Sequence, residues 1–298
     1  MKFLKQFSIF LSVALLTLTA FSCSESGLTD PDTNNEEVNS NVPATFTVKL
    51  TDAPGDFESV FVDIQKVKIH RADSAETDTT QSDSTEADST DDDDRWITVS
   101  EEPMRVDLLT LQNGNIITLG ETQLEPGTYD QMRLVLGDDN EVVVGGESHF
   151  LKTPSAQQSG LKLQIDAEVE GGSSYTLLVD FDASRSIVKT GNGNNPNFNY
   201  LLKPVLRAVN LQETGSISGI VEPTDFSTSV FTVVNEDTIA TTTEEDGSFQ
   251  IMGLAAGLYD LNFEPDSSGF QDTTITDIEV LEGEDTDIGT VTLSENEN

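Results

Sequence analysis

The chain has 298 residues and a formal net charge of −39 at pH 7, from 54 acidic residues against 15 Lys and Arg, with one cysteine and two histidines. This charge opposes binding to nucleic acid and to anionic lipid surfaces, because both need basic residues to neutralise phosphates. His70 and His149 cannot supply an HExxH motif or a three-histidine zinc site, and one cysteine excludes an internal disulfide. We therefore predict no metal, no cofactor and no nucleic-acid partner.

The first residues form an export signal. Lys2 and Lys5 precede an apolar stretch from Phe7 to Phe21. It is shorter than the roughly 20 residues that span a bilayer, which indicates a secretory signal over residues 1–22. The segment ending at Cys23 resembles a bacterial lipoprotein signal, and the resemblance implies that Cys23 is acylated and anchors the chain in the outer membrane. The alternative is a cysteine that merely lies near the cleavage site.

Residues 23–44 are polar and acidic, with almost nothing to bury, so we predict a flexible tether. Acidic residues soon after a lipidated cysteine resemble a surface-export signal, although only Glu25 is close to Cys23. The expected location is therefore the outer membrane, facing either the cell surface or the periplasm.

A first β-sandwich is predicted over residues 45–212. Apolar residues alternate with polar ones from Phe46 to Leu50, from Val60 to Ile69 with a bulge near Gln65-Lys66, and from Leu161 to Val169. Further strands are expected at 97–99, 106–111, 116–119, 175–181 and 200–211. No segment of ten or more residues shows helical periodicity, which favours an antiparallel sandwich.

Four motifs in this region resemble a bacterial family, domain of unknown function 4382. They are Leu50-Thr51-Asp52-Ala53-Pro54, the Leu-Pro-Gly-Tyr turn ending at Tyr129 with Arg133, residues 179–187, and residues 202–207. The resemblance covers roughly residues 45–211. It implies a secreted or lipoprotein context and a β-rich domain, and it implies no reaction.

An acidic insertion interrupts this module at residues 72–95. It holds ten acids, no base between Asp73 and Asp94, and no large apolar residue, so we predict a disordered loop. One interpretation is a solvated low-complexity segment. The other is that its Asp-Ser/Thr-small triplets, which resemble acceptors of a general bacterial O-glycosylation system, carry glycans on Ser74, Thr79, Ser84 and Ser89.

A second sandwich is predicted over residues 213–293, followed by a tail at 294–298. It has 19 acids from Gly215 onward and no Lys or Arg. Asp246-Gly247 is a hairpin-turn signal. Motifs at 215–221, 243–249, 253–259 and 283–289 resemble the carboxypeptidase regulatory-like domain, which implies a transthyretin-like seven-strand sandwich, grouped with carbohydrate-binding-like folds, in an accessory role.

Each module contains a Gly-containing turn that leads into a strand beginning with Tyr, at Tyr129 and at Tyr259. Tyr259 shares a face with Leu261 and Phe263, so it is expected to point inward and bond its hydroxyl as a tyrosine corner does. For Tyr129 two alternatives stay open. Either a bulge near Asp130 turns it inward, or it shares an outer face with Arg133, and these two residues then mark a ligand face.

Catalytic signatures are scarce. There is no Gly-x-Ser-x-Gly elbow, P-loop or Rossmann motif, and the best catalytic pair is Asp180 with Asp182 beside Arg185. Lys203-Pro204 with Arg207 is interpreted as a strand edge. We predict that the protein is not an enzyme.

Three function classes follow. The first is a structural or adhesive envelope lipoprotein, whose partners are the membrane and other envelope proteins. The second is a carbohydrate-binding module whose glycan platform would come from the rings of Trp96, Tyr129, Tyr175, Phe198, Tyr200 or Tyr259. The third is a glycoside or ester hydrolase.

Overall fold

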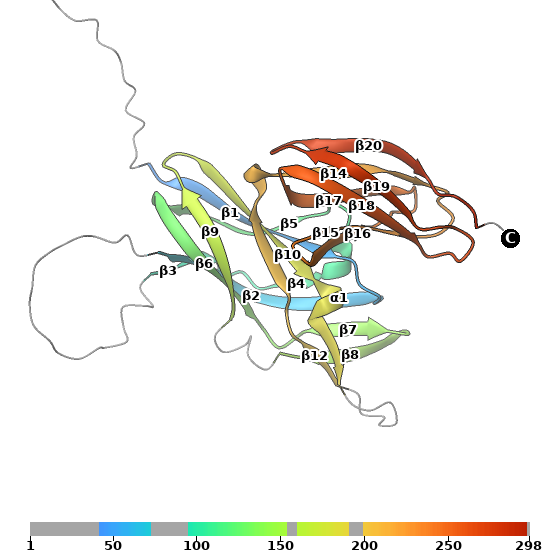
Figure 1. The fold of residues 1–298 in the computed structure, drawn as a ribbon. Coiled ribbons are helices and arrows are strands. Elements are labelled where there is room, and N and C mark those ends of the chain that lie inside the picture. Colours follow the sequence, from blue (N-terminus) through green and yellow to red (C-terminus); the bar gives the residue numbers. More distant parts are fainter. Residues whose placement is uncertain (1–41, 73–94, 154–159, 191–198, 297–298) are drawn as a thin grey trace, which may run out of the picture. The chain divides into compact units, whose positions relative to one another are not determined.

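The computed structural model describes residues 42–72, 95–153, 160–190 and 199–296. All of these described residues belong to one compact unit. The described residues of this unit are all-β, with two β-sandwich modules in tandem, as predicted (Figure 1). The unit therefore contains both modules that the sequence predicted as consecutive domains.

The smaller sheet of the first module has four strands in the order β13-β10-β1-β5. The strands are β1 Ala44–Ala53, β5 Ile117–Leu124, β10 Ser174–Asp182 and β13 Leu206–Asn210. β1 pairs with β10 in parallel and with β5 antiparallel, so the motif at residues 50–54 lies beside the end of β10.

The larger sheet has nine strands, seven of them in the order β11-β12-β8-β7-β2-β6-β9, with β3 and β4 also paired to β2. The strands are β2 Ser59–Arg71, β3 Trp96–Ser100, β4 Met104–Asp107, β6 Gly127–Leu136, β7 Glu141–Val144, β8 Glu147–Lys152, β9 Leu161–Val169, β11 Ile187–Thr190 and β12 Asn199–Leu202. The register of β2 against β6 shifts between Ile64 and Lys66, which confirms the bulge predicted there.

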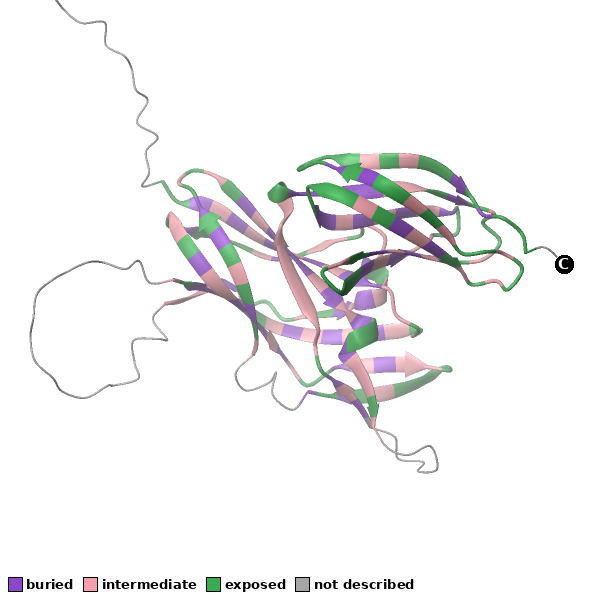
Figure 2. Ribbon diagram, in the orientation of Figure 1, coloured by how far each residue is buried: buried purple, intermediate pink, exposed green. Residues whose placement is uncertain are grey.

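Apolar alternation places the core of the first module. In β1 the side chains of Phe46, Val48 and Leu50 are fully buried. In β9 every second residue is exposed while Leu163, Ala167 and Val169 are buried. Figure 2 shows this alternation as buried bands along the strands. Each sheet thus turns one face inward, as a period of two requires.

Three local expectations for the first module need correction. The strand expected at 200–211 is two strands, β12 and β13, which lie in different sheets and are interrupted around Pro204, because proline has no N–H to donate to a sheet. Residues 108–111 form a 3-10 helix, η1 Leu108–Leu111, rather than a strand, because the Asp107 carboxylate accepts the Leu109 N–H at 3.3 Å and caps the turn. The pairing is also not wholly antiparallel, since β1 with β10 and β12 with β8 run parallel.

The second module has seven strands in two sheets, β17-β14-β20 and β16-β15-β18-β19. The strands are β14 Thr214–Glu222, β15 Thr228–Val234, β16 Asp237–Thr242, β17 Ser248–Ala255, β18 Gly257–Pro265, β19 Thr273–Val280 and β20 Asp285–Thr292. Phe249 and Phe263 meet edge to face in its core, with ring centroids 5.6 Å apart. Asp246-Gly247 forms a turn but no hairpin, because β16 and β17 belong to different sheets.

The modules join without an intervening linker. β13 ends at Asn210, whose side chain accepts the Gln212 N–H and caps η2 Leu211–Glu213, and β14 begins at Thr214. Besides η1 and η2, the described residues contain one helix, α1 Ala183–Ser186. None of these helices exceeds four residues, so no described helix is able to cross a membrane.

Candidate functional site

Three carboxyl groups gather where β1 and β10 end. The parallel register sets Thr51 opposite Asp180 and Ala53 opposite Asp182, which places Asp52 between them. Asp52 is only 4% exposed. Its Oδ1 accepts the Ala183 N–H at 3.0 Å, whereas its Oδ2 has no hydrogen-bond partner among the described residues.

Burial raises the pKa of Asp52 from 3.8 to about 9, and the negative charges of Asp180 and Asp182 act in the same direction, against the Ala183 N–H, which lowers it. The nearby Gln112 side chain also opposes the shift, but it makes no hydrogen bond to Oδ2. Asp52 is therefore protonated at neutral pH. A buried acid of this kind costs stability, which makes Asp52 a candidate functional position.

Asp180 and Asp182 are each held by an arginine. Arg207 Nη2 lies 3.0 Å from Asp180 Oδ2, and Arg185 Nε lies 3.3 Å from Asp182 Oδ2. Asp182 also accepts the Arg185 N–H, and burial raises its pKa. These contacts bind both carboxylates into ion pairs, which does not suit the free acid and base that glycoside hydrolysis requires.

The same arginines reach the second module. Arg207 Nη1 donates to the Gly253 carbonyl at 2.8 Å, and Arg185 Nη1 lies 3.2 Å from Asp237 Oδ1. β13, which carries Arg207, is an edge strand that starts just after Lys203-Pro204, as interpreted from the sequence. The carboxyl cluster therefore sits at the junction of the two modules.

Asn113 provides a third link across the junction. Asn113 and Gly114 have φ values of +57° and +76°, and the Asn115 N–H closes the turn on the Gln112 carbonyl at 3.1 Å. The Asn113 N–H donates to Thr241 Oγ1 at 3.0 Å. Its side chain accepts the Gln250 N–H and donates to the Ser248 carbonyl, so the amide pairs with β17 as a neighbouring strand would.

A small cavity of about 20 Å³ lies between Asp52 and these groups. Its lining includes Thr51, Asn113, Thr241 and Gln250. The volume is enough for about one water molecule. Asp52 also lines this cavity, but its Oδ2 atom is itself buried.

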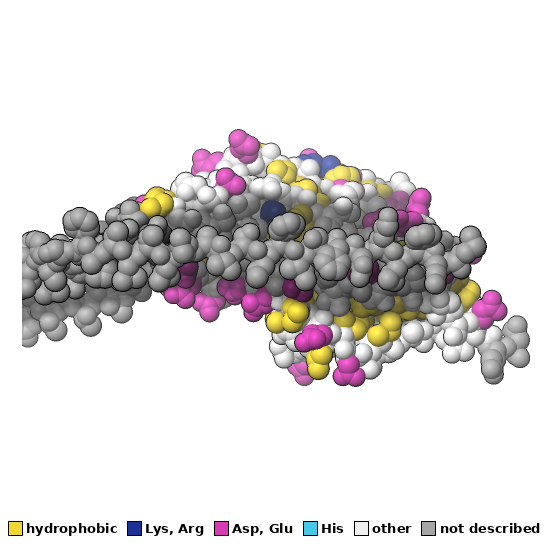
Figure 3. Space-filling view, turned by 90° about the horizontal axis from the view of Figure 1, so that it is seen from above, with side chains coloured by type: hydrophobic (Ala, Val, Ile, Leu, Met, Phe, Trp, Pro, Cys, Tyr) yellow, Lys and Arg dark blue, Asp and Glu magenta, His cyan; other side chains and the backbone are white. Residues whose placement is uncertain are grey.

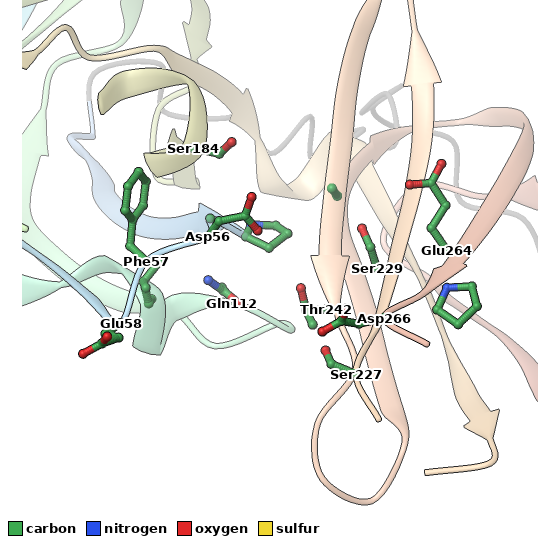
Figure 4. A pocket seen from close by; sticks show the side chains of 15 residues that line it. Asp56, Phe57, Glu58, Gln112, Ser184, Ser227, Ser229, Thr242, Glu264 and Asp266 are labelled. Carbon is green, nitrogen blue, oxygen red and sulfur yellow. The ribbon is translucent and has the colours of Figure 1, made fainter. Parts of the chain in front are cut away.

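A larger cleft of about 720 Å³ opens next to the junction (Figure 4). Figure 4 shows two walls: Asp56, Phe57, Glu58, Gln112 and Ser184 from the first module face Ser227, Ser229, Thr242, Glu264 and Asp266 from the second. The lining has no Lys, Arg, His or Cys among the described residues. It offers hydroxyls and carboxylates for binding, but no histidine or thiol for nucleophilic chemistry.

The predicted ligand residues Tyr129 and Arg133 do not share a surface. Between Tyr129 and Gln131 the register of β6 shifts against both of its neighbours, β2 and β9. This shift marks a bulge at Asp130, which confirms the alternative in which a bulge turns Tyr129 inward. Tyr129 is fully buried and donates its hydroxyl to the Glu125 carbonyl at 2.8 Å. Arg133 instead lies outside the core, with its guanidinium 4.0 Å from the ring centre of Trp96.

Most of the predicted aromatic platform is core. Tyr175 and Tyr200 are buried like Tyr129, with 6% and 5% exposure. Tyr259 is half-buried and bonds its hydroxyl to Ala255. Phe198 lies outside the described residues, and Trp96, half-buried beside His70 and Arg133, is the remaining candidate.

The two histidines serve separate local contacts. His70 Nδ1 lies 2.7 Å from Asp130 Oδ1, and His149 packs on the Tyr200 ring. Within the described ranges, no group of three or more His, Cys, Asp or Glu could hold a metal ion. Cys23 and the acceptors Ser74, Thr79, Ser84 and Ser89 lie outside the described residues.

Two groups at the junction were not predicted as site residues from the sequence. Asp52 entered only as a member of the motif at residues 50–54, and its position next to a Pro-Gly turn gave no sign of burial. Asn113-Gly114 is a turn signal that could have been found. Asn113 bonds to Gln250, which is 137 residues away in the chain, so the sequence could not predict that Asn113 links the two modules.

Surface charge agrees with the composition. Figure 3 shows Asp and Glu side chains at many points of the visible face and few Lys or Arg. Because the second module has no Lys or Arg, basic side chains of the two modules can come only from the first. Any basic surface on the two modules must therefore lie on the first.

A family model described as "Domain of unknown function (DUF4382)" matches residues 43–204. This region corresponds to the resemblance drawn from the four motifs. The match ends before the second module, whose assignment to the carboxypeptidase regulatory-like domains stays a prediction. A search of curated proteins finds no match.

Similar solved structures include the Bacillus anthracis TIE protein and two pilins. The Bacillus anthracis TIE protein has 13% identity and a TM-score of 0.21, covering 85% of this chain and 34% of that one. GBS52, the minor pilin of Streptococcus agalactiae, has 11% identity and a TM-score of 0.22, with 85% and 97% coverage. The shaft pilin spaA from Lactobacillus rhamnosus GG has 7% identity and a TM-score of 0.24, with 86% and 99% coverage. This chain thus spans about a third of the first of these proteins, and at such TM-scores no inference rests on the likeness.

Proposed function

The chain belongs to the family of domain of unknown function 4382, and from this premise we propose that it is a non-catalytic lipoprotein of the bacterial cell envelope with a structural or adhesive role. The observation that carries the proposal is the junction of the two modules. A three-residue helix joins the last strand of one module to the first strand of the next. Asn113, Arg185 and Arg207 bond across the joint.

A joint of this kind suits a spacer. Short connections and several hydrogen bonds oppose independent motion of two modules, whereas linked domains otherwise move. A tether anchored by Cys23 would then hold a stiff two-module body away from the membrane. The engaged state of Asp180 and Asp182 supports a role without catalysis and weighs against the hydrolase alternative.

Stiffness is measured by the distance between two spin labels. The chain has no cysteine besides Cys23, so labels placed by Lys152→Cys and Leu281→Cys in a Cys23→Ser background report one distance between the modules. We expect a narrow distribution. The double variant Asn113→Ala, Arg207→Gln is expected to broaden it, and a distribution already broad in the parent protein would contradict the spacer role.

The anchor is tested by growing producing cells with an alkyne fatty acid. The parent protein is expected to carry the label and fractionate with the outer membrane, and Cys23→Ala is expected to lose both. Protease added to whole cells distinguishes surface from periplasmic display. A labelled Cys23→Ala protein, or an unlabelled parent, would contradict the lipoprotein assignment.

The acidic insertion adds a separate prediction. We propose that Ser74, Thr79, Ser84 and Ser89 carry glycans, because each lies in an Asp-Ser/Thr-small triplet of one acidic segment. The intact mass of the native mature protein should exceed the mass of the acylated mature chain by hexose units. Replacing all four by Ala should remove the hexose units, and a native mass equal to that of the acylated chain alone would refute the proposal.

Carbohydrate binding is the second candidate. Burial of Tyr129, Tyr175 and Tyr200 removes them as a stacking platform. Trp96 keeps this candidate open, because it lies half-exposed beside the cation of Arg133. A glycan array tests it, with neutral and acidic glycans scored separately.

A further inference from the structure

Three basic residues lie side by side on the larger sheet of the first module. The register pairs Lys68 of β2 with Arg133 of β6, and Arg133 with Lys162 of β9. Neighbouring strands are about 4.8 Å apart, so the three Cα positions span roughly 10 Å across the sheet.

The three side chains are on the outer face of the sheet. Their chain neighbours Val67, Ile69, Met132, Leu134 and Leu163 are buried in the core. Successive residues of a strand point to opposite faces, so the bases point away from the core. Lys162 is exposed, and Lys68 and Arg133 are half-exposed.

The positive charges of this row of three bases, Lys68, Arg133 and Lys162, are not paired with carboxylates of the described residues. Lys66 pairs with Glu101 at 3.1 Å, but none of the three row residues makes an ion pair with a described residue. Arg133 lies over the Trp96 ring at 4.0 Å, and its buried Nε has no hydrogen-bond partner in the described ranges. Like charges directly opposite each other destabilise a sheet. A chain of net charge −39 thus keeps three bases together at a cost.

The next row of the same face carries polar and aromatic groups. His70 stands opposite Trp96 on one side and Gln131 on the other, and Gln131 stands opposite Gln164. His70 is held by Asp130. The amides of Gln131 and Gln164 can donate and accept hydrogen bonds, as sugar hydroxyls require.

We propose that this basic face, formed by Lys68, Arg133, Lys162, Trp96, Gln131 and Gln164, binds an acidic polysaccharide. Carboxylate or sulfate groups contact the three bases, and neighbouring hydroxyls contact the two amides. The bases supply the charge complementarity, and the amides favour a hydroxyl-rich polymer over a simple anion. The inference deepens the proposed adhesive role, on which it rests for its setting at the cell envelope.

The total charge of the protein gives this binding a signature. At physiological ionic strength the screening length is about 8 Å, so a bound polymer interacts more strongly with the three bases than with the distant acidic residues. At very low salt the whole negative field repels the polymer, and at high salt the contacts themselves are screened. Affinity is therefore expected to pass through a maximum at intermediate salt, unlike the steady fall of a basic protein.

Binding is measured by calorimetry on the purified protein with four probes of similar length: polygalacturonate, a sulfated dextran, neutral dextran and single-stranded DNA. We expect heat with polygalacturonate or the sulfated dextran and none with neutral dextran. These two anionic probes separate the carboxylate from the sulfate source. Binding of neutral dextran with equal affinity, or tighter binding of DNA, would overturn the proposal.

Paired variants locate the site. Lys68→Gln with Lys162→Gln should weaken binding by about ten-fold and reduce the salt dependence, because two cationic contacts are lost. Lys152→Gln with Lys203→Gln removes the same charge from exposed positions outside the row and should change affinity less than about two-fold. Equal losses in the two variants would refute the basic face. The binding assay uses no membrane, so the absence of binding would not contradict acylation of Cys23. Conversely, a result against acylation of Cys23 would not contradict polysaccharide binding.

Discussion

The two modules contain the same tyrosine contact at different depths. Tyr129 and Tyr259 each donate a hydroxyl to the carbonyl four residues earlier, at 2.8 and 2.7 Å. Each is followed by a shift of strand register. Tyr129 is fully buried, whereas Tyr259 is half-exposed. The tyrosine whose inward direction was the clearer prediction is thus the less buried one.

The difference shows what a local motif determines. The glycine turn and the hydroxyl bond arise from neighbouring residues, so both modules form them. The depth of burial depends on strands that come from elsewhere in the chain. β6 lies between the 13-residue β2 and β9 in a nine-strand sheet, while β18 lies in a sheet of four. The hydroxyl bond of Tyr259 is confirmed, but its ring only borders the core.

Removing the two tyrosine rings should give the largest difference in stability loss between the modules. Tyr129→Ala is expected to lower the free energy of unfolding by about 3–5 kcal/mol, because it leaves a cavity in a closed core. Tyr259→Ala should cost roughly half as much, since its ring already meets solvent. Urea unfolding followed by circular dichroism measures both, and equal losses would break the comparison.

The buried acid of the first module should destabilise it as the pH rises, whereas in the second module the pKa values of Asp246 and Asp285 are lowered, mainly by hydrogen bonds to their carboxylates. The folded pKa of Asp52, about 9, lies above its value of 3.8 in the unfolded chain, so stability is lost as pH rises from about 4 to about 9. Asp52→Asn keeps the acceptor for Ala183 and should raise the free energy of unfolding at pH 8 by about 2 kcal/mol or more. The exposed Asp56→Asn is the control. A variant no more stable than the parent at pH 8 would contradict the burial of an uncompensated acid.

Removing the link between the modules tests whether they unfold together. Asn113→Ala deletes both side-chain hydrogen bonds to β17, which should cost about 1–2 kcal/mol. Calorimetry should then resolve two transitions where the parent shows one. Asn115→Ala, in the same turn but outside the link to β17, should leave the transitions joined. Separate transitions in the parent would mean that Asn113 does not couple the modules.

The smallest effect concerns the hydroxyls alone. The Tyr129 hydroxyl bond is part-buried and that of Tyr259 is exposed. Tyr129→Phe should therefore cost about 1 kcal/mol, and Tyr259→Phe about 0.5 kcal/mol or less, because the Ala255 carbonyl can bond to water. Urea midpoints at constant m-value measure the difference. A larger loss for Tyr259→Phe would reverse the order of burial.

Much of the fold follows from periodicity. Alternation located β1, β2 and β9, and the slip in phase at Gln65-Lys66 located a bulge. The parallel pairing of β1 with β10 did not follow, because a strand's own pattern does not name its partner. The strand predicted at residues 108–111 was wrong for a related reason. An apolar run is compatible with a strand or with a turn of helix, and here the Asp107 cap favours the helix.

The candidate site was less predictable than the fold. Asp52 accepts a hydrogen bond from the N–H of Ala183, which lies 131 residues later, and Arg207 donates one to the carbonyl of Gly253 in the other module. Such contacts depend on packing between distant strands. Arg133 was singled out for its place after a tyrosine turn, but its neighbours Lys68 and Lys162 emerge only from the strand register.

The pairing of β14 with β20 has a mechanical consequence. These are the first and last strands of the second module, and they run parallel from Ser216 opposite Asp285 to Glu222 opposite Thr292. Opposite pulls on the two ends of the module act along these strands and load their hydrogen bonds together, in shear. An antiparallel pair pulled from its open end would lose its hydrogen bonds singly and in sequence, so the parallel arrangement resists tension better.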